Sequence, residues 1–561
     1  MASSFVSSIA IPGLEALLET APGKTTAVAG VNQTLAAVIA CIAAEKGKKT
    51  LLVADNDLKA ARAADDVRQL TGEGCCLPGG EIDLTRAAGS MESNWRRLEA
   101  LAAVTEGKVR ILCAGAEAMA QRMGRPEPFR ALSLTLKPGD VFPPADLARR
   151  LSRMGYDRVG MVEGKGQFAQ RGSILDVYPP ALAQGLRIEF FDDEIDGIRE
   201  FDCISQRSLG DVPEAVLTPA CEVLLEEDEY PEAARRMREA IDDQPDTDIG
   251  KELLFDDLPP LPDDEDDAEL FDKKVAPKIR EKQYQEQKEL EADRRMERLR
   301  QDAETLEQGL PFRRMRAWLP VLTDKTASVC DWFEPDLVLL CEPDRLRNRI
   351  EERLQGFAED LQSAITRREA VTGQEGLLKD WDTVLKELKQ YPKGLLTEIL
   401  LGLGGIKPDN TVTVEATGIQ GYGGQMRALK NDIALWREHG YRIYLLSGGS
   451  SRGKRLEESL KELDEKTEFR EEMSAAKPAG AGRESGLQRE TLRRKTRQRG
   501  DPADHPLRRF RDPRERALPR YGGGLGRGHL GRGLPAEQEP EALRRADLHL
   551  YGPEGRRLCG A

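Results

Sequence analysis

The stretch Thr25–Asp55, TTAVAGVNQTLAAVIACIAAEKGKKTLLVAD, decides how the N-terminal part of the chain folds. It contains an apolar strand at Thr25–Ala29, a short loop, a helix from Leu35 to Glu45 and a second apolar strand. A buried strand followed by a loop and a helix is the unit from which parallel α/β sheets are built. The helix N-terminus after such a strand is also a natural anion site. We therefore expect an α/β domain with the architecture of a nucleotide-binding unit.

The loop of this unit lacks the groups that phosphate binding needs. A phosphate-binding loop, G-x-x-x-x-G-K-[ST], uses its Lys for the outer phosphates and the next hydroxyl for Mg²⁺. The loop after the first strand, Gly30 to Thr34, has no Lys, and the sequence GKT at residues 23–25 comes before the strand instead of after it. We predict a degenerate nucleotide loop containing Gly30, Asn32 and Thr34, and we expect no cofactor in this chain.

A second glycine loop follows the apolar strand YRIYLL and matches G-x-x-x-x-G-K from Gly448 through Gly453 to Lys454. The next residue, where Ser or Thr would bind Mg²⁺, is Arg455. Two interpretations remain open: a phosphate loop formed by Gly448, Gly453 and Lys454, or an exposed turn before a helix. The missing hydroxyl favours the turn.

Composition narrows the class of protein. The chain has 561 residues, enough for several domains, and is 39% hydrophobic and 32% charged. No apolar run approaches the roughly 20 residues of a membrane span, and the N-terminus lacks the basic segment of a signal peptide. Nine scattered Cys without C-x-x-C, and only four His, make a metal site, a disulfide framework or His-based catalysis unexpected. We expect a cytoplasmic protein that does not contact a membrane.

The last ninety residues differ from the rest. Residues 471–561 contain 18 Arg but no Ile, Val, Trp or Asn, and they carry 20 Lys and Arg against 13 Asp and Glu, although the whole chain has a net charge of −14. Without β-branched aliphatic residues a packed core is hard to build. The tail at 469–561 is therefore expected to be disordered, or to be an off-frame translation of a GC-rich gene.

Between the first α/β segment and the tail, the sequence pattern changes several times. Residues 131–215 contain short strands joined by turns, including LRIEF with alternating polarity. Residues 225–270 are strongly acidic and are expected to be a partly mobile excursion. Residues 272–308 have the pattern of a long charged helix, and DLVLLCEP at 336–343 reads as another buried strand. A further α/β pattern runs from about 355 to 468.

One segment carries a resemblance to a known family. GQFAQRGSILDVYPPALAQGLRIEFFDDEIDGIREFD, residues 166–202, resembles the UvrB-like interaction domain of bacterial transcription-repair coupling factors (Mfd). MGYDRV before it, SQRS and LTPACEVLL after it, and NWRRLEALAAV upstream are similar to the same family, and the similarity extends over about residues 1–468. In that family the first α/β domain is a UvrB relative whose phosphate loop has degenerated, in agreement with the reading of the Gly30 loop.

The resemblance implies a domain plan. We expect a UvrB-like, degenerate RecA-type α/β domain at 1–130 that continues at 216–352 with the acidic excursion and the long helix. A mixed α+β interaction domain at 131–215 is inserted in it, and a third α/β domain at 353–468 precedes the tail. The family's ATP-dependent translocase motor, with its GKT/GKS loop and D-E-x-H box, is not found in this sequence, so a chain truncated or frameshifted before the motor is expected.

The resemblance also implies a function. In the family the inserted domain docks the damage-recognition protein UvrA, and the matching residues are Arg171, Arg187 and Phe191. Arg and aromatic side chains are frequent interface hot spots, and the two Arg are expected to pair with carboxylates of the partner. Alternation in LRIEFF places Phe191 on the face opposite Ile188 and Phe190.

The alternative for these residues is structural: Arg187 pairs with Asp192 or Asp193, and Phe191 belongs to the core. The expected function is binding of UvrA, which links stalled transcription to nucleotide excision repair, with no motor and no enzymatic activity in this chain. DNA and RNA polymerase are expected as partners only through domains absent from it. The alternatives are an NTP-binding protein using the Gly448–Lys454 loop, or a nucleic-acid binder using the Arg-rich tail.

Overall fold

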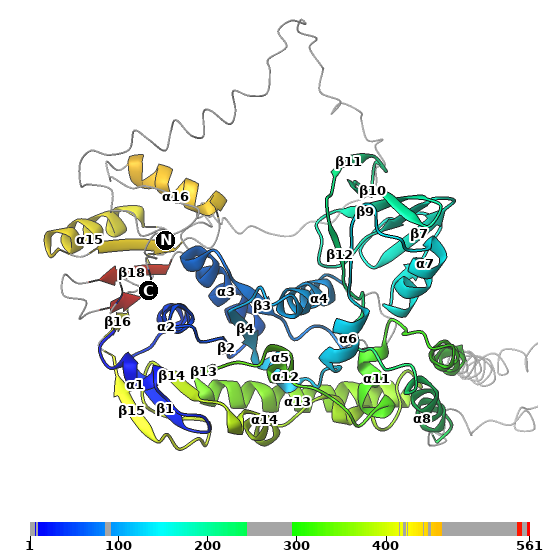
Figure 1. The fold of residues 1–561 in the computed structure, drawn as a ribbon. Coiled ribbons are helices and arrows are strands. Elements are labelled where there is room, and N and C mark those ends of the chain that lie inside the picture. Colours follow the sequence, from blue (N-terminus) through cyan, green and yellow to red (C-terminus); the bar gives the residue numbers. More distant parts are fainter. Residues whose placement is uncertain are drawn as a thin grey trace, which may run out of the picture.

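The fold is that of a computed structural model, which describes residues 11–82, 91–243, 294–414, 416–418, 425–440, 442–446, 450–462, 547–551 and 558–560, together with the single residues 6, 9, 84 and 422. Within these residues, two sheets organise most of the chain (Figure 1). A seven-stranded sheet forms the body, and a six-stranded sheet stands beside it.

The seven-stranded sheet is parallel throughout, with strand order β15-β1-β14-β13-β2-β4-β3. Its central strands are apolar runs buried on both faces, as expected where helices cover both sides of a sheet. The strands are β1 (Thr25–Ala29), β2 (Thr50–Ala54), β3 (Cys75–Leu77), β4 (Ile111–Gly115), β13 (Leu337–Cys341), β14 (Lys393–Thr397) and β15 (Asn410–Thr413).

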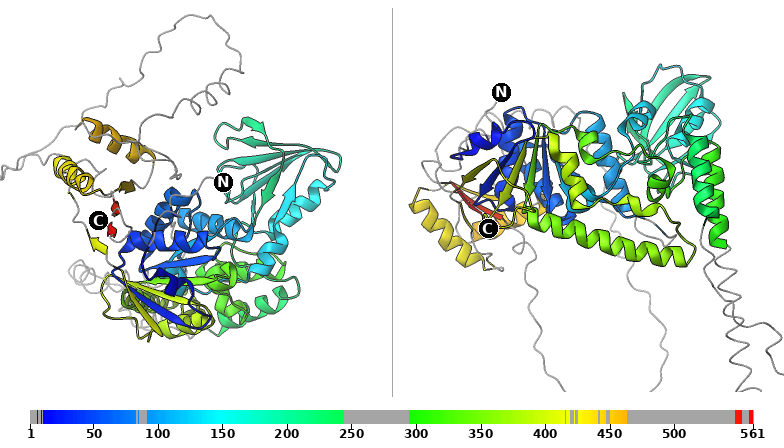
Figure 2. Two further views of the ribbon diagram at one scale, coloured as in Figure 1. Left: turned by 60° about the vertical axis from the view of Figure 1, so that its left-hand side comes forward. Right: turned by 90° about the horizontal axis from the view of Figure 1, so that it is seen from below.

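Helices cover both faces of this sheet and create two apolar clusters (Figure 2). One face is covered by α1 (Leu14–Leu18), α2 (Gln33–Glu45) and α3 (Asp57–Thr71). The other is covered by α4 (Glu92–Thr105), α5 (Ala116–Ala120), α12 (Val329–Phe333), α13 (Pro343–Thr366), α14 (Trp381–Glu387) and the short 3₁₀ turn η4 (Leu388–Gln390).

The six-stranded sheet belongs to a segment inserted between α6 (Pro126–Leu132) and α8 (Tyr230–Asp242). Its strand order is β11-β10-β9-β8-β7-β6, and α7 (Pro144–Arg153) packs on its inner face together with a small β5–β12 ladder. The strands are β5 (Leu134–Leu136), β6 (Asp157–Arg158), β7 (Gln167–Arg171), β8 (Ile174–Val177), β9 (Gly185–Phe191), β10 (Glu194–Phe201), β11 (Ser208–Asp211) and β12 (Ala215–Leu217).

A buried ion pair joins this inserted domain to the body. Arg97 on α4 donates from Nε to Glu222 at 2.5 Å and from Nη2 at 3.1 Å. The two side chains are only 1% and 4% exposed. Since Glu222 follows β12 where the chain returns to the body, the pair holds the exit of the inserted domain against α4.

Two further units complete the described structure. A helical lobe combines α8, a helix at residues 294–307, α11 (Met315–Leu322), the 3₁₀ turn η3 (Gln374–Leu377) and the second half of α13 around one apolar cluster. A smaller unit contains α15 (Met426–Glu438), α16 (Ser450–Glu462) and a sheet of order β16-β19-β18-β17. Its strands are β16 (Ala416–Gly418), β17 (Arg442–Leu446), β18 (Asp547–Tyr551) and β19 (Leu558–Gly560).

The fold class predicted from the sequence is confirmed: a parallel α/β domain with an inserted mixed domain and a further α/β unit. The predicted strands at 25–29, within 50–55 and within 336–343 all lie in the parallel sheet. The structure differs at the predicted boundary at 353. Strands β14 and β15 flank β1, so residues 353–414 belong to the first α/β domain and not to a third domain.

Two other expectations change in part. The segment 225–270 was expected to be a mobile excursion, but its residues 230–242 form helix α8. Tyr230, Ala233, Met237 and Ile241 recur at helical spacing and are buried in the lobe. In the tail, 469–546 lies outside the described residues, yet Asp547–Tyr551 forms a strand that pairs with β17. Its sequence DLHLY alternates Leu with polar residues, which suits a strand despite the absence of Ile and Val.

Candidate docking face and nucleotide loops

Strand β9 divides its side chains between the two faces of the six-stranded sheet. Ile188 and Phe190 are buried in the core of the inserted domain, whereas Phe191 is 78% exposed. Arg187 and Glu189 share the outer face with Phe191 because side chains alternate along a strand. The expected alternation is therefore confirmed, and the alternative that Phe191 is a core residue is wrong.

Arg187 is not free to reach outward. Its Nε and Nη2 donate to the two carboxylate oxygens of Asp176 on β8, at 2.7 and 3.0 Å, and its Nη1 donates to the carbonyl of Gln206 at 3.3 Å. The guanidinium also stacks over the ring of Phe201, 5.1 Å from its centroid. The hydrogen bond to Asp176 raises the pKa of Arg187 further above its ordinary range. The expected partner, Asp192 or Asp193, is wrong: the carboxylate comes from the neighbouring strand.

Arg171 ends β7 and remains accessible, with 53% of its side chain exposed. Its Nη2 lies 3.6 Å from the same Asp176 carboxylate. The structure thus brings Arg171 and Arg187 together around one buried acid, with Phe191 two residues beyond Glu189 on the same face. Local sequence patterns do not single out Asp176 in ILDV, although an acid between apolar strand residues signals a buried partner.

The outer face also carries two apolar side chains that sequence reasoning missed. Ile174 on β8 lies opposite Glu189 in the ladder and is 37% exposed. Val141, in the loop before α7, forms an isolated bridge with Glu194 on β10 and is 74% exposed. Neither residue is marked by local sequence, because strand register places them beside Phe191.

The predicted degenerate nucleotide loop lies at the carboxyl end of β1, where ligands bind in open α/β sheets. The backbone N–H of Gly30 donates to Glu398 O at 3.2 Å, and that of Val31 to Thr397 O at 2.9 Å. Asn32 caps α2 by accepting from Leu35 N at 2.9 Å, and Thr34 is buried in the helix. Two N–H groups of the loop and one N–H group of the first helical turn are thus bound to the protein itself.

A small cavity of about 120 Å³ adjoins this loop, between α2, α3 and α13. Its charged lining comprises the carboxylates of Asp55, Glu342 and Glu398 and the cations of Lys59 and Arg345. Lys59 is bound to Asp55 at 2.6 Å. The cavity lining therefore has three carboxylates and two cations, and Lys59 is already paired with Asp55. Because negative charges outnumber positive ones, this lining disfavours a polyphosphate.

The second glycine loop falls only partly within the described residues. Gly448 lies outside them, whereas Gly453 and Lys454 are in helix α16, which begins at Ser450. Both residues are therefore past the first three positions of a helix rather than in a loop. The phosphate loop formed by Gly448, Gly453 and Lys454 therefore stays a prediction, and the position of helix α16 does not support it.

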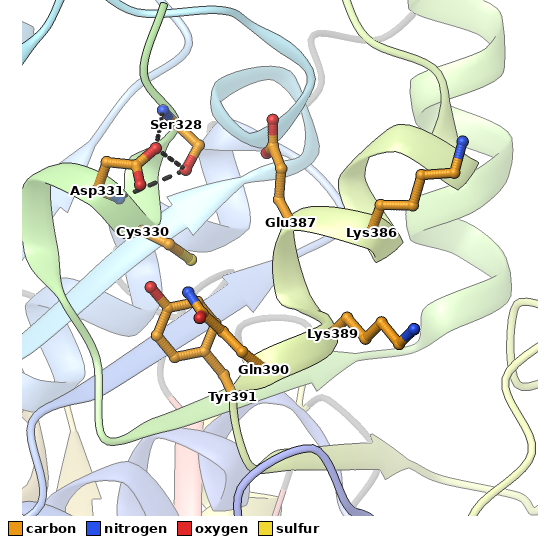
Figure 3. Close-up of a pocket in the computed structure, with 8 residues that line it drawn as sticks. All are labelled: Ser328, Cys330, Asp331, Lys386, Glu387, Lys389, Gln390 and Tyr391. Atoms are coloured by element: carbon orange, nitrogen blue, oxygen red, sulfur yellow. Dashed lines mark hydrogen bonds between the residues drawn. The ribbon is translucent and has the colours of Figure 1, made fainter.

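A larger hollow of about 570 Å³ lies between α12 and the α14–η4 segment (Figure 3). Both elements precede strands β13 and β14, so the hollow is at the amino edge of the sheet, opposite the edge that usually binds ligands. Ser328 and Asp331 are engaged with each other in a capping box, and the Lys386 and Lys389 amines point away from them. Burial raises the pKa of the Cys330 thiol to about 12, which keeps it protonated and unreactive. We assign no chemistry to this hollow.

Within the part of the chain that the structure describes, no group of three or more His, Cys, Asp or Glu is arranged to hold a metal ion. None of the helices there combines the length and apolar character that a membrane crossing requires.

Residues 134–222, which contain the six-stranded sheet, match the UvrB interaction domain family. The transcription-repair-coupling factor of Bacillus subtilis (strain 168) is 25% identical over 448 residues, 79% of this chain and 34% of that protein. The factor of Myxococcus xanthus is 43% identical over 114 residues, 20% of this chain and 10% of that protein.

UvrABC system protein B of Clostridium perfringens (strain 13 / Type A) is 32% identical over 123 residues, 22% of this chain and 19% of that protein. The chain thus spans about a third, or less, of the length of these curated relatives. The resemblance identified in the sequence is confirmed by these matches. The chain carries a UvrB interaction domain and is similar, over most of its length, to the N-terminal region of transcription-repair coupling factors.

Proposed function

We propose that the outer face of the six-stranded sheet docks a UvrA-type damage-recognition protein and so links this chain to nucleotide excision repair. The observation that carries the proposal is Phe191, a large aromatic side chain held on a rigid strand with 78% of its surface exposed. Exposed aromatic residues on rigid elements are typical of interface anchors. The matched UvrB interaction domain and the repair proteins among the relatives support the choice of partner.

The three predicted docking residues have different roles in this proposal. Phe191 is the apolar anchor, and Arg171, which is half-exposed, is available to a partner at the edge of the face. Arg187 acts as a positioning residue: bound to Asp176, it fixes strands β8 and β9 against each other beneath the face. The chain's activity in this proposal is binding, and it needs no cofactor.

The test is a titration of purified UvrA against the full chain and its Phe191→Ala variant. We expect the variant to bind at least about tenfold more weakly, since truncating a hot-spot aromatic commonly costs 2 kcal/mol or more. Ile204→Ala is the matched control, because Ile204 is 91% exposed in the turn after β10, at the opposite end of the sheet. Equal affinity of Phe191→Ala and wild type, with both folded by circular dichroism, would reject the docking face.

A further inference from the structure

Phe191 is one member of an apolar ridge that crosses the end of the six-stranded sheet. Glu194 lies opposite Phe191 of β9 on one side and opposite Val141 on the other. Directly opposed residues of an antiparallel ladder have Cβ atoms about 5 Å apart, which puts Val141 about 10 Å from Phe191 on the same face. Ile174, opposite Glu189, is the diagonal neighbour of Phe191 on the other side. We call Val141, Phe191 and Ile174 the apolar ridge.

The backbone holds Val141 in this position firmly. Phe142 N donates to Asp193 O at 2.7 Å, and Gly139 N donates to Ile195 O at 2.7 Å. Ile195 N in turn donates to Asp140 O at 2.9 Å. The loop before α7 therefore adds a short strand-like edge to β10. Val141 is displayed by a fixed backbone and is still 74% exposed, so no rearrangement is needed for it to contact a partner.

The surroundings of the ridge are acidic. All the ionisable side chains of the hairpin from 192 to 196 are acids, and all are exposed: Asp192, Asp193, Glu194 and Asp196. Asp140 adds another exposed carboxylate beside Val141. The neighbouring cation Lys137 lies 3.4 Å from Glu214, and Arg199 is bound to Glu189 and Asp211. Arg171 contributes a positive charge only beyond Ile174.

We propose that Val141 is a second apolar anchor beside Phe191, and that the partner receives the ridge in an apolar pocket with a basic rim. The inference rests on the proposed docking function and specifies its partner surface. Charge complementarity carries it: Val141 and Phe191 have the carboxylate of Glu194 between them and those of Asp140, Asp192 and Asp193 close by, so they fit a surface of opposite charge and disfavour an acidic one. The expectation that two Arg of this chain meet carboxylates of the partner is thereby replaced, because Arg187 is already bound to Asp176.

The apolar part is tested with Val141→Ser in the full chain, titrated with purified UvrA. We expect about tenfold weaker binding, as for truncation of an interface anchor. Ile204→Ser is the matched control and should bind like wild type, since it is a comparably exposed aliphatic residue at the far end of the sheet. Wild-type binding with an unchanged Val141→Ser affinity overturns this inference but leaves the docking proposal standing. No binding by wild type overturns both.

The charge part is tested with the double variant Asp193→Asn/Glu194→Gln. Its side chains keep their size, so the hairpin is retained while two negative charges are removed. We expect binding about threefold to tenfold weaker and less sensitive to salt, because rim charges act mainly on association rate and salt dependence. Glu163→Gln/Glu200→Gln, at the opposite end of the domain, should change neither quantity. Tighter binding of the first variant would mean an acidic partner surface and would overturn the basic rim.

Discussion

Both carboxylate oxygens of Asp176 accept hydrogen bonds from the guanidinium of Arg187, at 2.7 and 3.0 Å between the heavy atoms. The two residues are opposite each other in the β8–β9 ladder, and the Asp176 side chain is only 2% exposed. Arg171 lies 3.6 Å from the same carboxylate. Asp176 is therefore nearly buried, with Arg187 as its close cation and Arg171 as a more distant one. The sequence alone predicts that Arg187 pairs with a carboxylate of the partner protein.

Replacing Arg187 by Ala should damage stability before it damages binding. The change leaves the Asp176 carboxylate buried with only the longer contact to Arg171, and removing one partner of a buried pair is strongly destabilising. We expect a loss of about 2–4 kcal/mol in the stability of the inserted domain at pH 7. The measurement is the shift of the urea midpoint followed by circular dichroism.

Arg199→Ala is the matched control for this change. Arg199 also bridges two acids on the outer face, Glu189 at 3.2 Å and Asp211 at 3.0 Å, but its side chain is 45% exposed. Exposed pairs contribute about 0–1 kcal/mol, so the control should shift the midpoint little. Similar losses in the two variants would show that burial of Asp176 is not the cause.

The Arg97–Glu222 pair should make the junction between body and inserted domain sensitive to acid. Burial by itself raises the pKa of Glu222, but the charges of Arg97 and Arg316 and the hydrogen bond from Arg97 outweigh it and hold that pKa below the ordinary 4.5. A carboxyl with a lowered folded-state pKa stabilises the protein above its unfolded pKa and loses this contribution as the pH falls further.

Glu222→Gln tests this acid sensitivity. We expect the variant to be about 3–5 kcal/mol less stable than wild type at pH 7, since Arg97 remains buried without a carboxylate. The difference between the two proteins should shrink below about pH 4.5, where Glu222 of the unfolded chain begins to bind a proton while Glu222 of the folded protein is still ionised. Urea midpoints measured from pH 7 to pH 3 give the comparison, with the exposed Glu127→Gln as control. A difference that is constant over this range would contradict the assignment.

The strands of the parallel sheet and the exposed position of Phe191 were predictable because both follow from local patterns. Uniform apolar runs such as TLLVA at 50–54 indicate strands buried on two faces, and alternation in LRIEFF separates Phe191 from Phe190. The lack of a phosphate-binding Lys after Gly30 was likewise visible in the amino-acid sequence.

Other features depend on pairing between distant segments and carry no local signal. Strand β14 pairs with β1, which places residues 393–397 in the first sheet. The sequence of β14 itself does not indicate which strand it pairs with. The Asp176–Arg187 pair and the bridge between Val141 and Glu194 are set by ladder register. Helix α8, by contrast, does have a local signal, because its apolar residues recur at helical spacing. The acidic composition of the surrounding segment favours a mobile region and hides this signal.

Asp57 should limit stability at neutral pH. It lies in the first turn of α3, and its pKa is raised to about 6, mainly by burial and also by the nearby Glu117, against the hydrogen bond from Gly79 N. Its Oδ1 and the Oε2 of Glu117 are buried without hydrogen-bond partners. A carboxyl whose folded-state pKa is raised costs stability once the pH rises from about 4 through 6, because the unfolded state ionises more readily.

Asp57→Asn removes this cost while keeping an oxygen that accepts from Gly79 N. We expect a gain of about 1–2 kcal/mol at pH 7 and little gain at pH 4, read from urea midpoints at the two values. Asp65→Asn on the same helix serves as control: its ion pair with Arg68 is about half exposed on both sides, so its loss should cost at most about 0.5 kcal/mol. A destabilised Asp57→Asn at pH 7 would disprove the argument.

The full chain should not bind Mg-ATP saturably. In the first loop the N–H groups of Gly30 and Val31 are bound to carbonyls of residues 397–398, and the adjoining cavity has more carboxylates than cations. In the second, Lys454 lies within helix α16 and Arg455 stands where a Mg²⁺-binding hydroxyl is needed. Isothermal titration calorimetry with millimolar Mg-ATP should show only heats of dilution. If saturable binding is observed, Arg345→Ala and Lys454→Ala locate it: loss in the first variant assigns it to the β1 edge, and loss in the second restores the glycine-loop hypothesis.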